Sequence, residues 1–216
     1  MTQTGLDLRD LRVTHAGTQI AALNTRIAPA EVLVVMGPSG SGKSTLLSAI
    51  IGSLPAGFGV SGQIVLNGRD VTLLPTAQRR IGILFQDDVL FPHLSVGQNL
   101  GFGLPSSAGD KAQRRALIDQ ALADADMAGF ANRDPASLSG GQRARAALLR
   151  TLLAQPSALL LDEPFSRLDL GLRHHIRQFV LDRARKSGLP VILVTHDPGD
   201  AQAAGGHIVG PDGAAL

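Results

Sequence analysis

The chain has 216 residues, 44% of them hydrophobic, so it can bury the core of one domain or of a domain with a subdomain. It has no cysteine, which excludes disulfides, thiolate metal sites and a cysteine nucleophile, and is typical of a reducing compartment. The net charge of +2, without a basic tail, argues against a nucleic-acid-binding arm. Residues 1–10 lack the pattern of a signal peptide, and no apolar run reaches the roughly 20 residues of a membrane span. We therefore expect a cytosolic protein.

The first third of the chain contains segments with the alternation of short strands. Residues 6–13 and 18–27 have this pattern, and residues 63–66 run into the turn Asn67-Gly68. We expect these segments to form an antiparallel flank.

Several other apolar runs are short, continuous and bounded by turn residues, as buried parallel strands are. They are residues 32–35, 81–85, 158–161 and 191–194. Together they predict an α/β core with a parallel sheet.

A glycine-rich loop directly follows the first of these runs and precedes a helix-like segment at residues 46–51. Glycines allow the backbone N–H groups to wrap around phosphates, and a helix directs its positive end at the same anion. Lys43 is expected to reach the β- and γ-phosphates, and Ser44 to hold Mg²⁺ through its hydroxyl. A plain Gly/Ser turn is the alternative, which the strand and helix context disfavours. The predicted phosphate loop comprises Gly37, Pro38, Ser39, Gly40, Ser41, Gly42, Lys43, Ser44 and Thr45.

The composition and periodicity of the sequence change between Asp87 and Leu138, where a Pro/Gly/Ser stretch leads into helical patterns. One predicted helix has Leu117, Ile118, Ala121, Leu122 and Ala125 on a single face. A second is expected from about residue 142 to 154, before Pro156. The spacing of Arg143, Arg145 and Arg150 fits the solvated edge of that helix better than a nucleic-acid patch. This middle segment is therefore predicted to be a helical insert.

Two carboxylates, Asp162 and Glu163, end the apolar run at residues 158–161. Ligands of open α/β sheets usually bind at the carboxyl ends of the strands. Asp162 fits an acid that orients Mg²⁺ together with Ser44, and Glu163 could polarise an attacking water. A strand end capped by solvated acids is the alternative.

The sequence Leu138-Ser139-Gly140-Gly141-Gln142 is a second glycine-rich loop at a predicted helix start. It offers backbone donors and a positive helix end to an anion. The alternative is a simple N-cap by Ser139, although capping alone does not require two glycines followed by a glutamine.

Taken together, these motifs make the chain resemble, nearly end to end, the nucleotide-binding subunit of an ATP-binding cassette (ABC) transporter. The residues 138–142 motif is the specific mark of that family. The resemblance implies that the phosphate loop is a Walker A loop binding ATP and Mg²⁺, with Gln86 as the Q-loop glutamine at the Mg²⁺ site. It makes Asp162 the Walker B ligand of Mg²⁺, Glu163 the catalytic base, residues 166–169 the D-loop and His196 the switch histidine at the γ-phosphate.

The family resemblance also implies an organisation and partners. Residues 1–86 and 159–216 would form the nucleotide-binding core, and residues 87–158 a helical subdomain. In a head-to-tail homodimer, Ser139, Gly140, Gly141 and Gln142 of one copy would close over ATP bound by the other. Residues 90–99 resemble those of importers, whose helical insert holds part of a separate membrane permease. Val89, Leu90 and Phe91 would line that groove, with core packing as the alternative for each. The expected location is the cytoplasmic face of the inner membrane, with a solute-binding protein in the same system.

The chain departs from the family pattern where an aromatic residue usually stacks on adenine. It has no Tyr or Trp, and its first Phe is Phe58, so His15 is the candidate for partial stacking, with a plain surface histidine as the alternative. Arg167 places an unexpected charge in the D-loop.

Two other functions remain open at this point. One is a non-transport ABC ATPase acting on nucleic acid or a protein complex, whose usual insertions the chain lacks. The other is a nucleotide kinase, which leaves the loop at residues 138–142 and His196 unexplained.

Overall fold

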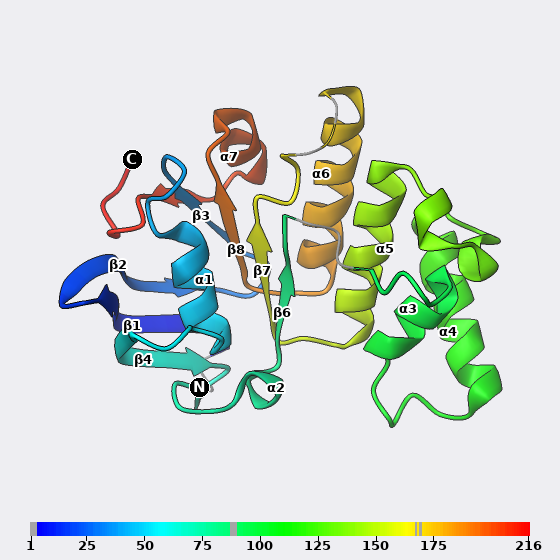
Figure 1. Cartoon of the computed structure of the whole chain (residues 1–216), viewed down its shortest axis with the longest axis horizontal. Helices are drawn as coiled ribbons and strands as arrows, with labels where there is room; N and C mark the ends of the chain where they lie inside the picture. Colours follow the sequence, from blue (N-terminus) through cyan, green and yellow to red (C-terminus); the bar gives the residue numbers. More distant parts are fainter. Residues whose placement is uncertain (1–3, 87–89, 167, 169) are drawn as a thin grey trace. The chain divides into compact units, whose positions relative to one another are not determined.

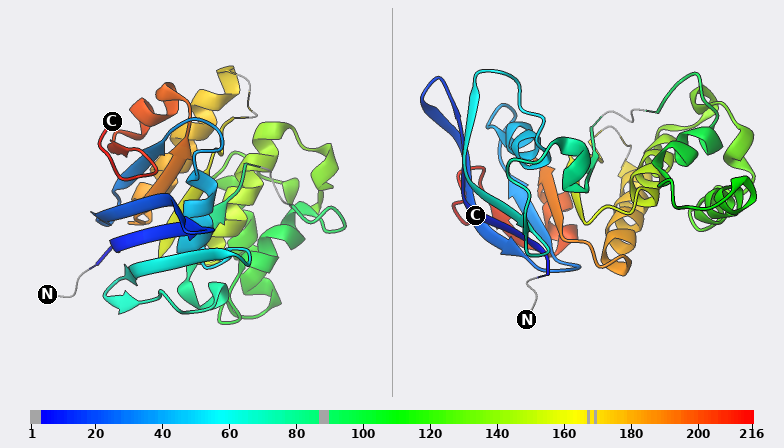
Figure 2. Two further views of the ribbon diagram at one scale, coloured as in Figure 1. Left: turned by 60° about the vertical axis from the view of Figure 1, so that its left-hand side comes forward. Right: turned by 90° about the horizontal axis from the view of Figure 1, so that it is seen from below.

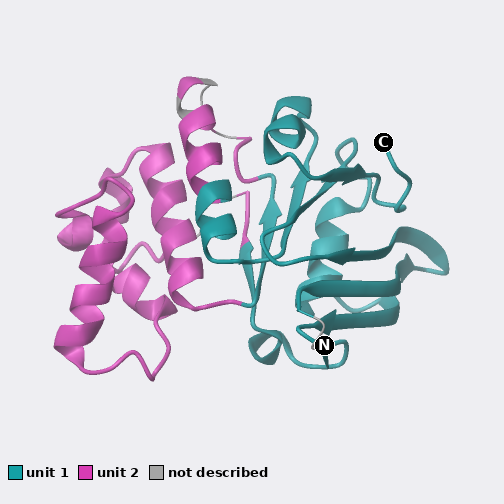
Figure 3. Cartoon of the chain, turned by 180° about the vertical axis from the view of Figure 1, so that it is seen from behind, with its two compact units in different colours: residues 1–83, 157–163, 181–216 teal, residues 84–156, 164–180 magenta. Residues whose placement is uncertain are grey.

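The computed structural model describes residues 4–86, 90–166, 168 and 170–216, so Val89, Arg167 and Asp169 lie outside the described residues. The chain forms two compact units, shown in Figure 3. The first, here called the core unit, comprises Met1–Ile83, Ser157–Glu163 and Leu181–Leu216. The second, the helical unit, comprises Leu84–Pro156 and Pro164–Val180.

The core unit contains the antiparallel flank that the sequence predicts (Figure 1). Its strands lie in the order β2-β1-β4-β5, and they are β1 (Leu6–His15), β2 (Thr18–Ile27), β4 (Phe58–Leu66) and β5 (Arg69–Asp70). Strand β4 begins well before the predicted residue 63. Its first half is largely exposed and pairs with β1 through the backbone, from His15 opposite Phe58 onward, so it carries no apolar alternation to reveal it.

A five-stranded sheet has the order β6-β7-β8-β3-β9, and β3 is parallel to both of its neighbours. Its strands are β3 (Val32–Met36), β6 (Ile81–Leu84), β7 (Ala158–Asp162), β8 (Val191–Thr195) and β9 (His207–Val209). The predicted parallel α/β core is thus confirmed, with the short β9 added at the edge. Helices α1 (Lys43–Ile51), α2 (Thr76–Arg79) and α7 (Pro198–Ala204) complete the core unit. Residues of both sheets and of α1 share one apolar core. Figure 2 shows the strands and helices from two further sides.

The helical unit is made of α3 (Val96–Gly103), α4 (Lys111–Ala123), two short 3-10 helices (Phe130–Asn132 and Pro135–Ser137) and α5 (Gly140–Leu153). Helix α6 (Leu170–Lys186) begins in this unit and ends in the core unit. No helix among the described residues has an apolar stretch long enough to cross a bilayer.

Two expectations about these helices are wrong in detail. In α4, Ile118 and Leu122 are buried, but Leu117 is 44% exposed, and Ala125 lies beyond the end of the helix.

The three arginines of α5 are not a solvated edge but are half-buried. Arg143 donates to Leu138 O, Arg145 donates to Ala125 O, and the Arg150 guanidinium lies 5.2 Å from the Phe91 ring centroid. Long arginine side chains can cover apolar surface with their stems. Here the head groups of Arg143 and Arg145 also bond backbone oxygens, which helical spacing alone does not reveal.

The end of α1 is held by a buried arginine that the sequence analysis did not single out. Arg79 is 7% exposed, and its guanidinium donates to the carbonyl oxygens of Ala49, Ile50, Thr72 and Leu74 at 2.7 to 3.0 Å. A cation at the carboxyl end of a helix also complements the helix dipole. Gly52 ends α1 at φ 81°, and a Cβ there would lie 2.5 Å from the Arg79 guanidinium carbon, so glycine is required.

We predict that Arg79→Ala lowers the free energy of unfolding by about 3 kcal/mol or more, because it leaves buried carbonyl groups unsatisfied. Arg79→Lys should cost less, since it keeps the charge but loses the planar fork. Urea unfolding measures both. Arg69→Ala, which removes an exposed arginine of β5, is the control. An Arg79→Ala protein as stable as this control would contradict the assignment.

Candidate active site

The predicted phosphate loop spans the end of β3 and the start of α1. Residues 37–42 form the loop, and residues 43–45 begin the helix. Gly40 and Gly42 have φ angles of 80° and 93°, which side chains other than glycine rarely adopt. A Cβ on Gly42 would lie 2.7 Å from a methyl carbon of Ile20 in β2. Gly42 precedes α1 and no side chain among the described residues caps this helix, so its positive end faces the loop uncovered.

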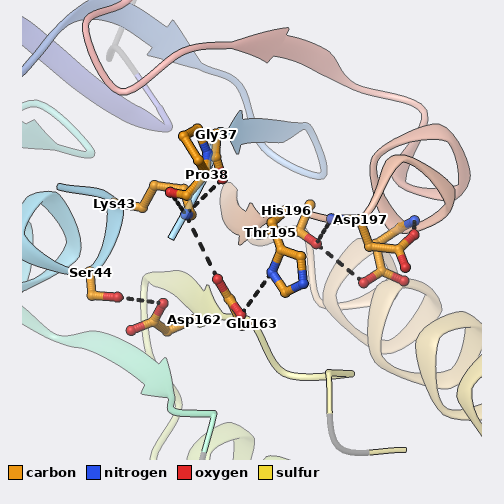
Figure 4. Close-up of polar contacts among 10 residues, drawn as sticks. Gly37, Pro38, Lys43, Ser44, Asp162, Glu163, Thr195, His196 and Asp197 are labelled. Carbon is orange, nitrogen blue, oxygen red and sulfur yellow. Dashed lines mark hydrogen bonds and ion pairs between the residues drawn. The ribbon is translucent and has the colours of Figure 1, made fainter. Parts of the chain in front are cut away.

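Lys43 is the charged centre of this loop. It is 4% exposed, and its Nζ donates to Gly37 O at 2.9 Å and to Pro38 O at 2.8 Å (Figure 4). The same nitrogen lies 3.8 Å from Glu163 Oε1. A buried ammonium is therefore held at the loop by two carbonyl oxygens and a nearby carboxylate.

Ser44 and Asp162 meet although 118 positions separate them in the sequence. The Ser44 hydroxyl donates to Asp162 Oδ1 at 3.0 Å (Figure 4). Burial raises the pKa of Asp162, and the neighbouring Glu163 carboxylate adds to this, while the Ser44 hydrogen bond and Lys43 oppose it. A hydroxyl and a carboxylate are hard oxygen donors of the kind that Mg²⁺ prefers.

The loop also holds a polar atom without a partner. Ser41 Oγ is buried and has no hydrogen bond within the described part of the chain. Buried hydroxyl groups are nearly always satisfied, and exceptions often point to a bound group. Together with the oxygen donors of Ser44 and Asp162, this atom makes the loop a good fit for a phosphate chain carrying Mg²⁺.

Glu163 lies between a lysine and a histidine side chain. Its Oε2 is 3.0 Å from His196 Nδ1, and its Oε1 faces Lys43. Glu163 has a φ angle of 46°, rare for a residue with a side chain, and its N–H donates to Val194 O at 3.0 Å. Such strain persists only where the surrounding structure enforces it, and it is frequent at functional sites. The motif predicts the carboxylate but not this backbone conformation.

His196 directly follows β8, whose last residue, Thr195, is paired with Met36 of β3. Since parallel strands end at the same edge of a sheet, this pairing brings the histidine beside the phosphate loop. Five predicted residues of the core unit therefore lie together at the carboxyl ends of β3, β7 and β8. They are Lys43, Ser44, Asp162, Glu163 and His196.

His15, the candidate for base stacking, ends β1 and is exposed, but it has an aromatic neighbour. Its ring centroid lies 4.4 Å from that of Phe58, with an interplanar angle of 30°. Strand pairing sets Phe58 opposite His15, a partner that was not predicted from the sequence. Its signal was present, because Phe58 is the first aromatic residue of an aromatic-poor chain.

The remaining predicted residues belong to the helical unit. Gln86 is exposed and follows β6. Ser139 caps α5 in a reciprocal arrangement, since its hydroxyl accepts from Gln142 N at 3.3 Å and Gln142 Oε1 accepts from Ser139 N at 3.0 Å. Ser139 therefore caps α5, and the reciprocal hydrogen bonds give Gln142 a structural role as well. Capping does not explain Gly140, where a Cβ would meet nothing nearer than 3.9 Å.

Sequence comparison places this geometry in a family. Residues 20–166 match the family model described as ABC transporter. The chain is 52% identical over 181 residues to the uncharacterized ABC transporter ATP-binding protein YnjD of Escherichia coli K12, covering 84% of this chain and 83% of that protein.

Other relatives have named import roles. The thiamine import ATP-binding protein ThiQ of Ruegeria sp. TM1040 is 40% identical over 197 residues, covering 91% of this chain and 84% of the relative. The sulfate/thiosulfate import ATP-binding protein CysA of Gloeobacter violaceus is 44% identical over 183 residues, covering 84% of this chain. The match spans 52% of that protein, so the chain covers only about half of some relatives. The chain belongs to the ABC transporter family and is an ATP-binding subunit with ATPase activity.

Proposed function

We propose that this ATPase powers solute uptake through separate membrane permease subunits, as a head-to-tail homodimer at the cytoplasmic face of the inner membrane. The observation that carries the proposal is the convergence of Lys43, Ser44, Asp162, Glu163 and His196 at the ends of three parallel strands. The import names of the relatives support the direction of transport, and a solute-binding protein would belong to the same system. These names also weigh against a non-transport ABC ATPase.

In this proposal the phosphate loop binds the ATP phosphates through its backbone N–H groups, with Lys43 on the β- and γ-phosphates. Ser44 and Asp162 would hold Mg²⁺, and the family resemblance adds Gln86 as a further ligand. When bound, Mg²⁺ neutralises charge on the transferring phosphate. Glu163 orients the attacking water and accepts its proton, and its contacts with Lys43 and His196 keep the carboxylate at the loop. His196 donates a hydrogen bond to the γ-phosphate.

The stacked rings of His15 and Phe58 are proposed to contact the adenine base. His15 ends β1, and Phe58 begins β4 opposite it. The next strand, β2, carries Ile20, which lies beside Gly42 of the phosphate loop. Two stacked rings offer more apolar surface than a single imidazole, which supports a role for the pair where other family members use one large aromatic residue.

The Ser139 loop is proposed to close over ATP bound by the second copy. The N-terminus of α5 supplies a positive helix end, and its first turn carries Gly140 and Gly141. The open space around Gly140 supports this role, because neither its neighbours nor its backbone requires a glycine there. A glycine is required if another molecule approaches the backbone closely.

The helical unit is proposed to dock on the permease. Of the predicted groove residues, Leu90 is buried, as the core-packing alternative expects, and Phe91 is half-buried, with its ring 4.9 Å from that of Phe102. Phe102 is 71% exposed, so this pair of rings presents apolar surface to solvent. A cavity of about 830 Å³, lined in part by Gln98 and Gly101 of α3 and Lys111 and Ile118 of α4, lies in the same unit. An exposed ring and a hollow are features of a protein-docking surface.

We predict that Glu163→Gln lowers the ATP turnover number at least about 100-fold, because it removes the general base. ATP binding should persist, since the phosphate loop is unchanged, and the variant should accumulate as a dimer with ATP and Mg²⁺. Turnover assays, nucleotide binding and light scattering measure the three effects. Glu31→Gln changes the other glutamate of the chain and is the matched control. Near-normal turnover in Glu163→Gln would remove this residue from the role of base.

We predict that Phe102→Ser breaks the association with the permease while leaving the basal ATPase rate of the purified subunit unchanged, because the ring lies on the surface of the helical unit. The measurement is recovery of a multi-span membrane protein with the tagged subunit from detergent-solubilised membranes. Leu73→Ser, at a 95% exposed apolar residue of the core unit, is the control and should recover the permease normally. Equal recovery with both variants would exclude the proposed docking face.

A further inference from the structure

Two polar side chains beside His196 are almost completely buried. Thr195, the last residue of β8, and Asp200, in the first turn of α7, are each 2% exposed. Every other residue of β8 is apolar and buried. Burying a hydroxyl and a carboxylate here is costly unless both are bonded, so their contacts indicate what they stabilise.

These side chains fix the backbone on both sides of His196. The Thr195 hydroxyl donates to Asp200 Oδ2 at 3.3 Å and accepts from the N–H of Asp197 at 3.0 Å (Figure 4). Asp197 in turn caps α7, because its Oδ1 accepts from Gly199 N at 2.7 Å and from Asp200 N at 3.2 Å. The residues before and after His196 are thus joined by a hydrogen bond across it.

The His196 side chain needs this support because packing restrains it weakly. It is 49% exposed, yet its Nδ1 lies 3.0 Å from Glu163 Oε2. The imidazole has only two side-chain torsions, so the position of the backbone largely determines where the ring can lie. A half-exposed ring therefore keeps such a contact only if its backbone is fixed. Thr195 also fixes the turn to the sheet, through its pairing with Met36 just before the phosphate loop.

We propose that Thr195 and Asp200 are positioning residues, which hold the backbone of His196 so that its imidazole stays in place between Glu163 and the γ-phosphate. The inference rests on the proposed role of His196 in ATP hydrolysis. It assigns a function to a hydroxyl and a carboxylate that are each 2% exposed beside His196.

Thr195→Val tests the proposal, because valine keeps the shape of threonine and removes both hydrogen bonds. Turnover should fall about 10-fold to 100-fold, the effect of a small misplacement of a catalytic group, while the KM for ATP changes little. Thr195→Ser keeps the hydroxyl and should restore most of the turnover.

The matched control is Thr72→Val. The Thr72 hydroxyl also donates to an aspartate, Asp70, and accepts a backbone N–H, from Ile64, but it lies near the opposite end of α1. This variant should retain normal turnover. An equal loss in both variants would indicate a general effect on stability and overturn the proposal.

A double-mutant cycle separates positioning from structure. If Thr195 acts through His196, adding Thr195→Val to His196→Ala should cause no further loss of turnover, whereas independent effects would multiply and overturn the inference. If His196→Ala alone retains full turnover, the proposed role of His196 itself fails. Should Thr195→Val not fold, Asp200→Ala takes its place in the same cycle, with Asp200→Asn as the conservative variant.

Discussion

The buried ammonium of Lys43 is the interaction on which the rest of the site depends. A lysine with 4% exposure is stable only with compensating oxygens, and the backbone of its own loop supplies two of them. The loop that supplies these carbonyl groups also contains Gly40 and Gly42, whose φ angles other residues rarely adopt. Glu163, the third partner, is brought there by β7 in a strained conformation.

The parallel sheet converts this local arrangement into a site. Adjacent β7, β8 and β3 end at one edge, so the loop, the two acids and the histidine turn converge although they are far apart in the sequence. Burial at this edge raises the pKa of Asp162; the Glu163 carboxylate raises it further, and Ser44 and Lys43 lower it. At the other end of α1, Arg79 holds the helix whose first turn carries Lys43 and Ser44. Helix α1 therefore carries catalytic-site residues at one end and the stabilising contacts of Arg79 at the other.

The sequence predicted the parts of this molecule that have strong local signals. Short apolar runs indicated the parallel strands, and glycine spacing indicated the phosphate loop. The exposed half of β4 was missed because backbone pairing requires no apolar side chains, and its omission hid Phe58, the partner of His15. The roles of Arg79, Arg143 and Arg145 were missed because their partners are carbonyl oxygens, which any residue can supply. The network of Thr195 and Asp200 was equally hidden, since burial is a property of the fold.

The central claim is that two copies of the chain form each ATP site, one through Lys43 and the other through the Ser139 loop. Mixing two inactive variants, Lys43→Ala and Ser139→Arg, tests it most directly. In a head-to-tail heterodimer one site carries both defects and the other carries none, so mixing should restore ATP turnover. A mixture that stays inactive, although differently tagged subunits demonstrably form heterodimers, would contradict the account.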